Sequence, residues 1–313
     1  MSALFPAMNQ ANTKCAVGFV GLGVMGAPMT GHLARAGHAL ALFDIDVAAA
    51  RRVADGLPGA SVCKTLADVA TCSDIVITML PNGEVVRNVT LGADGLCQGL
   101  KPGALLLDTS SSEPWITREI GAALAAQGVA MVDAPVSGAK WGAEGAELVF
   151  MVGGTADDVA RVRPLLDVMG RAVHHLGALG AGHAMKCLNN MITAMNLMVL
   201  AEGLVIGTRY GLDPAAMTEV LKQSTGGSWV AQTHINQRVI NRAFDDPFKL
   251  DLMLKDVGIA MELARRGQIP APMSGLGHHL WQAASLSAGP GKSVSELVRW
   301  IEQSAQVEIR SPT

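Results

Sequence analysis

The 313-residue sequence has few charged and few aromatic side chains, which make up 16% and 4% of it. With a hydrophobic share of 50%, this composition excludes a disordered chain and predicts a well-packed globular protein. The formal net charge is −3, so the basic field that binds nucleic acids or anionic membranes is missing. The chain also lacks an unbroken apolar run of about 18 residues, the length of a membrane span. We therefore expect neither a nucleic-acid nor a membrane partner.

Cysteine is scarce too, and no two cysteines have the C-x-x-C spacing of zinc or redox sites. Their odd number and irregular spacing are typical of reduced thiols in a cytoplasmic protein. The residues before Cys15 lack the charged start and the apolar stretch of a secretory signal. We expect a cytoplasmic location and no metal site. The cysteines are Cys15, Cys63, Cys72, Cys97 and Cys187.

Short apolar runs alternate with helical patterns through the first half of the chain. This alternation predicts a parallel sheet with helices on both faces. The predicted strands are residues 16–20, 39–43, 75–79, 104–107, 130–132 and 149–152.

The pattern changes after His175. A glycine-rich loop leads into one long predicted helix, residues 183–210, which Gly211 ends. Shorter helical stretches follow, and no strand pattern of comparable strength occurs among them. We predict a Rossmann-type α/β domain at residues 15–176 and an all-α domain at residues 177–308. The shorter helical stretches are residues 214–223, 230–241, 252–266, 274–287 and 294–303.

A G-x-G-x-x-G motif lies between the first predicted strand and the first helix. The motif alone is weak evidence, but here the first glycine permits a tight turn after a strand, the second lets the backbone approach a pyrophosphate, and the third allows helix and strand to pack closely. Asp44 follows the next strand, where a carboxylate accepts hydrogen bonds from ribose hydroxyls and repels a 2′-phosphate. The sequence therefore predicts a nicotinamide dinucleotide site that favours NAD over NADP. The motif consists of Gly21, Leu22, Gly23, Val24, Met25 and Gly26.

Two further turns follow predicted strands at the edge where ligands bind in open α/β sheets. Leu80 and Pro81 end one of these strands, and we expect them to line the cofactor. The turn at residues 108–114 is rich in hydroxyl groups. These hydroxyl groups can contact a ligand at this edge. The alternative is that Ser112 or a neighbour caps the next helix.

Ser137 and Gly138 lie in a third such turn. The Ser137 hydroxyl and the Gly138 amide can donate hydrogen bonds to a carboxylate. A plain turn explains the segment equally well, so both interpretations stay open.

Lys186 lies early in the long apolar helix, and Asn190 shares its face one turn later. Burial and the positive end of the helix would lower the lysine pKa toward neutrality. A lysine with such a pKa suits general acid/base chemistry. The alternative is a lysine that extends its ammonium group to solvent from an interdomain helix.

Together these motifs resemble the β-hydroxyacid dehydrogenase family, which includes 3-hydroxyisobutyrate dehydrogenases and tartronate semialdehyde reductases. The resemblance extends from about residue 16 to residue 301, with five motifs in the family's order. It implies a 6-phosphogluconate dehydrogenase-like fold and an enzyme that interconverts a small β-hydroxy acid, such as 3-hydroxyisobutyrate or glycerate, and its semialdehyde. The motifs are residues 21–28, 80–82, 133–148, 180–190 and 255–256.

The resemblance also implies a role for each matching residue. Lys186 corresponds to the catalytic lysine, and Asn190 to the asparagine that holds the substrate. The turn that binds the substrate carboxylate corresponds to Ser137, Gly138 and Ala139, although the family usually has glycine in place of Ala139.

Three more positions follow from the same resemblance. Ser111 corresponds to a residue near the nicotinamide, and Lys255 to a lysine that closes over the cofactor. Trp229 lies where relatives place residues near the substrate tail. The resemblance further implies a homodimer or homotetramer.

The sequence is also compatible with other functions. Residues 77–100 also resemble sulfolactaldehyde reductase, and a succinic semialdehyde reductase is a related alternative. A non-catalytic cofactor-binding scaffold is an alternative of another class. Lys186 and Asn190 count against it, as they do against imine reduction, because such relatives lack the lysine.

Overall fold

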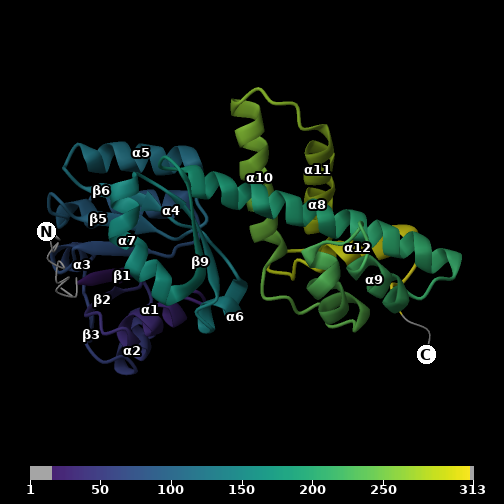
Figure 1. The fold of residues 1–313 in the computed structure, drawn as a ribbon, viewed down its shortest axis with the longest axis horizontal. Coiled ribbons are helices and arrows are strands. Elements are labelled where there is room, and N and C mark those ends of the chain that lie inside the picture. Colours follow the sequence, from purple (N-terminus) through teal and green to yellow (C-terminus); the bar gives the residue numbers. More distant parts are fainter. Residues whose placement is uncertain (1–15, 311–313) are drawn as a thin grey trace, which may run out of the picture.

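The computed structural model describes residues 16–310, so Cys15, where we predicted the first domain to begin, lies outside them. The chain forms an α/β part and a helical part, as Figure 1 shows. The helix α8, Ala181–Tyr210, starts at the α/β part and extends through the helical part. This architecture confirms the predicted fold class, while the division at residue 176 stays a prediction.

Within residues 16–310 the strands form one nine-stranded sheet in the order β3-β2-β1-β4-β5-β6-β8-β7, with β9 paired to β8. The strands β1 to β6 run parallel in this order. They are β1 Val17–Val20, β2 Leu40–Phe43, β3 Ala60–Val62, β4 Ile75–Thr78, β5 Leu105–Asp108, β6 Ala130–Asp133, β7 Val136–Ser137, β8 Leu148–Gly153 and β9 Gly170–Gly177.

The predicted parallel sheet is confirmed for β1 to β6 but has antiparallel pairs at one edge. The strand β8 runs antiparallel to both β6 and β7. The reason is that only the short helix α6, Ala139–Glu144, and a turn join β7 to β8, so the chain reverses directly. A parallel return needs a longer crossover.

Helices cover both faces of the sheet, as predicted. Successive strand side chains point to opposite faces, so Val76 and Ile77 belong to two separate hydrophobic cores. One core packs against α1, α2 and α7, and the other against α3, α4 and α5. These helices are α1 Gly26–Arg35, α2 Val47–Asp55, α3 Leu66–Thr71, α4 Gly83–Leu91, α5 Pro114–Ala125 and α7 Ala156–Met169, and a 3₁₀ turn covers Leu96–Gln98.

The helical part has its own core, in which Leu204, Trp281 and Leu297 are fully buried. Its helices besides α8 are α9 Pro214–Lys222, α10 Leu250–Arg266, α11 Pro272–Ala288 and α12 Glu296–Ala305.

One predicted α-helix, residues 230–241, has a different hydrogen-bond pattern. It consists of two π-helical turns, η2 Val230–His234 and η3 Asn236–Ile240. The buried residues Val230, Ile235 and Val239 recur every four to five positions. A wider helix with i→i+5 hydrogen bonds keeps such a pattern on one face.

Of the helices in the described part of the chain, α8 alone is long and apolar enough to cross a membrane, by length and composition. Of its most apolar window, 44% is buried inside the protein. The helices α10, α11 and α12 pack against it. A core helix of a folded domain meets the same criteria.

Candidate active site

The carboxyl ends of four neighbouring strands bring the predicted cofactor residues to one edge of the sheet. In the strand register, Val20 pairs with Phe43 and with Thr78, and Thr78 pairs with Asp108. Each predicted cofactor segment begins within three residues of one of these strand ends. The segments are residues 21–26, Asp44, residues 80–81 and Ser111.

The glycine-rich loop has two crowded positions and one open position. Gly21 has a φ of +97°, and a Cβ there would lie 2.3 Å from the carbonyl oxygen of Met79. A Cβ on Gly26 would lie 1.9 Å from the carbonyl oxygen of Gly21. A Cβ on Gly23, in contrast, would meet no atom within 4 Å. The open space over this loop, at the start of α1, fits the pyrophosphate of a dinucleotide.

The Asp44 carboxylate is fixed beside the same loop. The backbone N–H of Leu22 donates to its Oδ2 at 2.7 Å, and that of Asp46 donates to its Oδ1 at 2.8 Å. These two bonds hold the negative charge where a nucleotide ribose follows the pyrophosphate in this fold.

Lys186, Asn190 and Asp256 form a chain of hydrogen bonds between α8 and α10. Lys186 Nζ donates to Asn190 Oδ1 at 3.3 Å, and Asn190 Nδ2 donates to Asp256 Oδ2 at 2.6 Å. Asn190 and Asp256 are buried, and Lys186 is partly buried. The amide of Asn190 is therefore held in one orientation, with its oxygen toward the lysine.

Burial lowers the pKa of Lys186 below its usual value, as we expected from the sequence. The charge of Asp256 opposes this effect and raises the pKa, while the positive charge of Lys255 lowers it further. The amine of Lys186 therefore becomes neutral at a lower pH than that of a surface lysine.

Lys255, on α10, connects these hydrogen-bonded residues to the edge of the sheet where we expect the cofactor. Its Nζ donates to the carbonyl oxygen of Ser111 at 2.7 Å and to that of Pro81 at 3.3 Å. The same ammonium group lies 3.3 Å from Asp256 Oδ1. One lysine therefore joins two predicted cofactor loops to the neighbours of Lys186.

The predicted carboxylate-binding turn has unusual backbone geometry. Gly138 has a φ of +138°, and Ala139 has a φ of +53°. Because only glycine adopts positive φ at little cost, this geometry explains why the resembling family usually has glycine at the second position. None of the side-chain contacts found in residues 16–310 joins this turn, or the half-exposed Trp229, to Lys186.

Two features were not predicted. The motif at residues 255–256 predicts no role for Asp256, although this acid lies among the buried positions Met253, Val257 and Ala260 of one helix face. That position in the helical pattern was the available signal. The alternative that Ser112 or a neighbour caps α5 is wrong: the N-cap Glu113 makes no side-chain cap bond, and the Ser112 hydroxyl donates to Asp108 Oδ2 at 3.0 Å.

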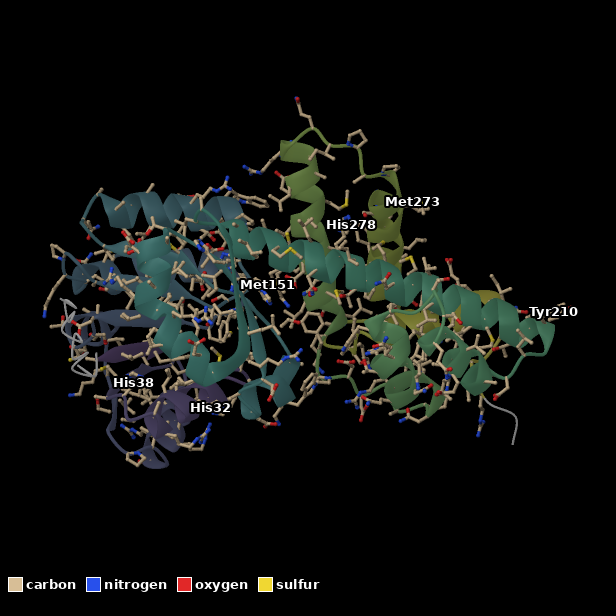
Figure 2. The ribbon with its side chains drawn as sticks, in the orientation of Figure 1. His32, His38, Met151, Tyr210, Met273 and His278 are labelled. Carbon is tan, nitrogen blue, oxygen red and sulfur yellow. The ribbon has the colours of Figure 1, made fainter. Side chains whose placement is uncertain are left out.

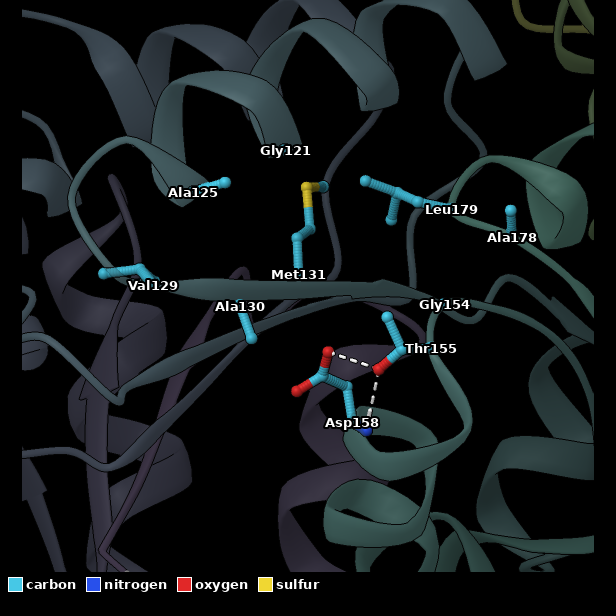
Figure 3. Close-up of a pocket in the computed structure, with 10 residues that line it drawn as sticks. All are labelled: Gly121, Ala125, Val129, Ala130, Met131, Gly154, Thr155, Asp158, Ala178 and Leu179. Atoms are coloured by element: carbon cyan, nitrogen blue, oxygen red, sulfur yellow. Dashed lines mark hydrogen bonds between the residues drawn. The ribbon is translucent and has the colours of Figure 1, made fainter.

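A shallow groove between α5 and β6 lies apart from these residues (Figure 3). Met131 and Leu179 point into it, and Thr155 donates to Asp158 beside it. None of the predicted cofactor or substrate residues lines this groove.

Two family models together match nearly the whole chain. One is described as the NAD binding domain of 6-phosphogluconate dehydrogenase and matches residues 16–177. The other is described as NAD-binding of NADP-dependent 3-hydroxyisobutyrate dehydrogenase and matches residues 180–301.

Individual proteins are similar over almost their full length. The 2-(hydroxymethyl)glutarate dehydrogenase of Eubacterium barkeri is 34% identical, over 94% of this chain and 97% of its own. The NAD-dependent L-serine dehydrogenase of Pseudomonas aeruginosa is 37% identical, over 85% of this chain and 91% of its own.

A solved structure agrees with these matches. The 3-hydroxyisobutyrate dehydrogenase of Mycobacterium tuberculosis, determined with L-serine, has a TM-score of 0.85 and is 33% identical. The similarity covers 92% of this chain and 99% of that protein. The chain therefore belongs to the β-hydroxyacid dehydrogenase family, and it is an oxidoreductase of that family.

Proposed function

We propose that this protein is an NAD-dependent dehydrogenase that interconverts a small β-hydroxy acid and its semialdehyde, with Lys186 as the general acid/base. The observation that carries the proposal is the series of hydrogen bonds from Lys186 through Asn190 to Asp256. Lys255 joins this series to the edge of the sheet where we expect the cofactor. The relatives named for 3-hydroxyisobutyrate, L-serine and 2-(hydroxymethyl)glutarate support the substrate class, since each substrate has a hydroxyl group β to a carboxylate.

The residues divide the chemistry between them. When bound, the nicotinamide exchanges a hydride with the carbinol carbon of the substrate. Neutral Lys186 takes the hydroxyl proton during oxidation, and its ammonium form returns the proton during reduction. Asn190 has two N–H donors; one is bound to Asp256, and the other is available to a substrate oxygen.

The substrate itself is held by separate groups in this proposal. The Ser137 hydroxyl and the Gly138 amide donate to the carboxylate, next to Ala139. Trp229 limits the size of the substrate group beyond the carboxylate. Holding the reacting atoms in place in this way lowers the barrier in addition to the effect of the proton transfer.

The substitution Lys186→Met tests the role of the lysine. We expect turnover to fall by about two to four orders of magnitude, the usual contribution of a general acid/base. The dissociation constant for NAD, measured by titration, should change less than about threefold, because Lys186 is not among the groups that hold the dinucleotide. Lys222→Met, on the distant helix α9, is the matched control. Near-normal turnover in Lys186→Met would overturn the proposal.

A substrate panel tests the rest of the proposal. It contains 3-hydroxyisobutyrate, glycerate, 3-hydroxypropionate, serine, 4-hydroxybutyrate and a sulfonate, each with NAD and with NADP. Preference for a β-hydroxy acid supports the proposal. Preference for the sulfonate or for 4-hydroxybutyrate points to the sulfolactaldehyde or succinic semialdehyde reductase alternative. NAD binding without turnover of any compound points to a scaffold.

The choice of NAD over NADP, the oligomeric state and the location remain parts of the proposal. The fixed carboxylate of Asp44 supports NAD. A homodimer or homotetramer is supported by an apolar stripe on the exposed face of α8. The cytoplasmic location stays a prediction.

A further inference from the structure

A second buried polar cluster lies one helical turn before Lys186. His183, in the first turn of α8, is 1% exposed. Its Nε2 lies 3.1 Å from the carbonyl oxygen of Ser110, and its Nδ1 lies 2.8 Å from Thr117 Oγ1. Both ring nitrogens therefore have a partner in the α/β part, although the residue belongs to α8.

A carboxylate from the sheet caps the first turn of α8. Asp133, at the end of β6, accepts from the backbone N–H of Gly180 at 2.7 Å and from that of His183 at 2.8 Å. Gly180 is the N-cap residue and has no side chain with which to cap the helix itself. An acid in this place satisfies free N–H groups and interacts favourably with the helix dipole.

A second carboxylate holds the loop on the other side of the imidazole. Asp108 accepts from Thr78 Oγ1, from the N–H of Ser110 and from Ser112 Oγ at 2.9–3.0 Å. The ring of His183 lies between the two acids, 3.7 Å from Asp108 Oδ2 and 3.6 Å from Asp133 Oδ2.

His183 thus links the two elements that surround the proposed reaction centre, the helix α8 and the loop at residues 110–112. On one side it is part of the helix that carries Lys186, at the i, i+3 spacing that places Cβ atoms about 5–6 Å apart. On the other side it contacts Ser110, whose neighbour Ser111 accepts the hydrogen bond of Lys255.

We propose that His183 is a positioning residue for Lys186: its imidazole fixes the first turn of α8 against the loop at residues 110–112. The inference rests on the proposed function, because it concerns the distance between the lysine amine and a substrate at the nicotinamide. A displacement of about 1 Å in such a geometry can lower a rate by about 10²-fold. The histidine itself takes no proton from the substrate.

The two variants His183→Gln and His183→Leu separate hydrogen bonding from packing. Glutamine offers an N–H for the Ser110 carbonyl and an oxygen for the Thr117 hydroxyl, whereas leucine fills the space and offers neither. We expect kcat to fall by about 10²-fold in His183→Leu and by less than about tenfold in His183→Gln. The KM for substrate and the dissociation constant for NAD should stay within about threefold in both.

Thr218→Val is the stability control. It removes a buried hydroxyl that donates to Pro214 within α9 and does not touch the first turn of α8. Tm is measured for all variants. If His183→Leu does not fold, Thr117→Val removes one partner of the imidazole, and a loss of kcat at unchanged KM is then expected.

Three results would overturn the inference. They are a kcat of His183→Leu (or of Thr117→Val, where it is used instead) within about threefold of the unaltered protein, an equal loss in His183→Gln, and a loss that Thr218→Val reproduces at the same Tm. An unaltered protein that turns over no compound of the substrate panel would contradict the proposed function instead. The two failures are therefore distinguishable.

Discussion

At the residue scale, two charged neighbours of Lys186 act on its pKa in opposite directions. Asp256 raises the pKa, and Lys255 lowers it, while burial sets the overall decrease. In the proposed mechanism Lys186 is the base of alcohol oxidation and must be neutral, so we expect kcat/KM to rise with pH through its pKa. The two neighbours should therefore be separable by their effects on one pH profile.

We expect Asp256→Asn to move the rising limb of this profile to lower pH, because the loss of the negative charge favours the neutral amine. Lys255→Gln should move the limb to higher pH, because the loss of the positive charge favours the ammonium form. The measurement is kcat/KM for oxidation as a function of pH. Lys222→Gln, which removes a distant positive charge, should leave the limb in place. Shifts of the same sign in both variants would contradict the assignment of Lys186 as the base.

In the proposed function, the carboxylate of Asp44 also selects NAD over NADP. In Asp44→Asn the charge that repels a 2′-phosphate is lost, while an amide oxygen can still accept the N–H of Leu22. We expect the ratio of kcat/KM with NAD to that with NADP to fall about tenfold, equivalent to about 1.4 kcal/mol. Asp94→Asn, which removes an exposed charge from the same part of the protein, should not change the ratio. An unchanged ratio in Asp44→Asn would show that other groups select the cofactor.

At the scale of single elements, the first residue of α6 has an unfavourable backbone conformation. Ala139 has a φ of +53°, a conformation that costs a residue with a Cβ about 1–2 kcal/mol. We expect Ala139→Gly to stabilise the protein by about 1 kcal/mol, which is a rise in Tm of about 1.5 °C for a chain of this length. Ala143→Gly, in the buried interior of the same helix, should destabilise it by at least about 1 kcal/mol. Thermal unfolding of both variants distinguishes relief of backbone strain from a general effect of glycine, and a lower Tm in Ala139→Gly would contradict this account.

Most elements could be predicted because their local patterns agree with their tertiary environment. The buried strands β1, β2, β4, β5, β6 and β8 are continuous apolar runs, and α8 ends at Gly211, where φ is +99°. The strands that escaped prediction lack such a pattern. β3 has three residues, β7 has two, and β9 is largely exposed, so none of them gives a period that a sequence window can detect.

The site could be predicted only in part for a related reason. Motif and spacing identify Lys186 and Asn190, since both belong to one helix. The contacts of Asp256 and His183 join residues more than 60 positions apart, and only the packing of α8 against α10 and the sheet creates them. A buried acid or histidine in a helical pattern predicts that a polar partner exists, but it does not identify the residue.

At the scale of the whole molecule, a hydrophobic cluster joins the two parts beside the proposed active site. Trp115, on α5, packs with Cys187, Ile259 and Ala260 of the helical part. The guanidinium group of Arg266 lies 4.3 Å from the centre of the Trp115 ring. Together with Lys255, these contacts hold α10 against the α/β part, so the distances in the proposed active site depend on how the two parts are joined.

The exposed face of α8 supports the proposed oligomer. Its apolar side chains follow at intervals of four and seven residues, which places them on one side of the helix. The stripe reaches the far end of α8, where Figure 2 labels Tyr210. An exposed apolar surface of this length is typical of an interface with another protein chain. The side chains and their exposed fractions are Leu188 37%, Ile192 53%, Val199 64%, Ile206 69% and Tyr210 86%.

We therefore expect the double substitution Val199→Glu and Ile206→Glu to convert a homodimer or homotetramer into a smaller species. Two carboxylates placed in a closed apolar interface lose their hydration, which opposes association. Light scattering after size exclusion, at several protein concentrations, measures the mass directly. Ala122→Glu, on the exposed side of α5, adds a charge elsewhere and should leave the mass unchanged. A monomeric unaltered protein, or an unchanged mass in the double variant, would contradict assembly through α8.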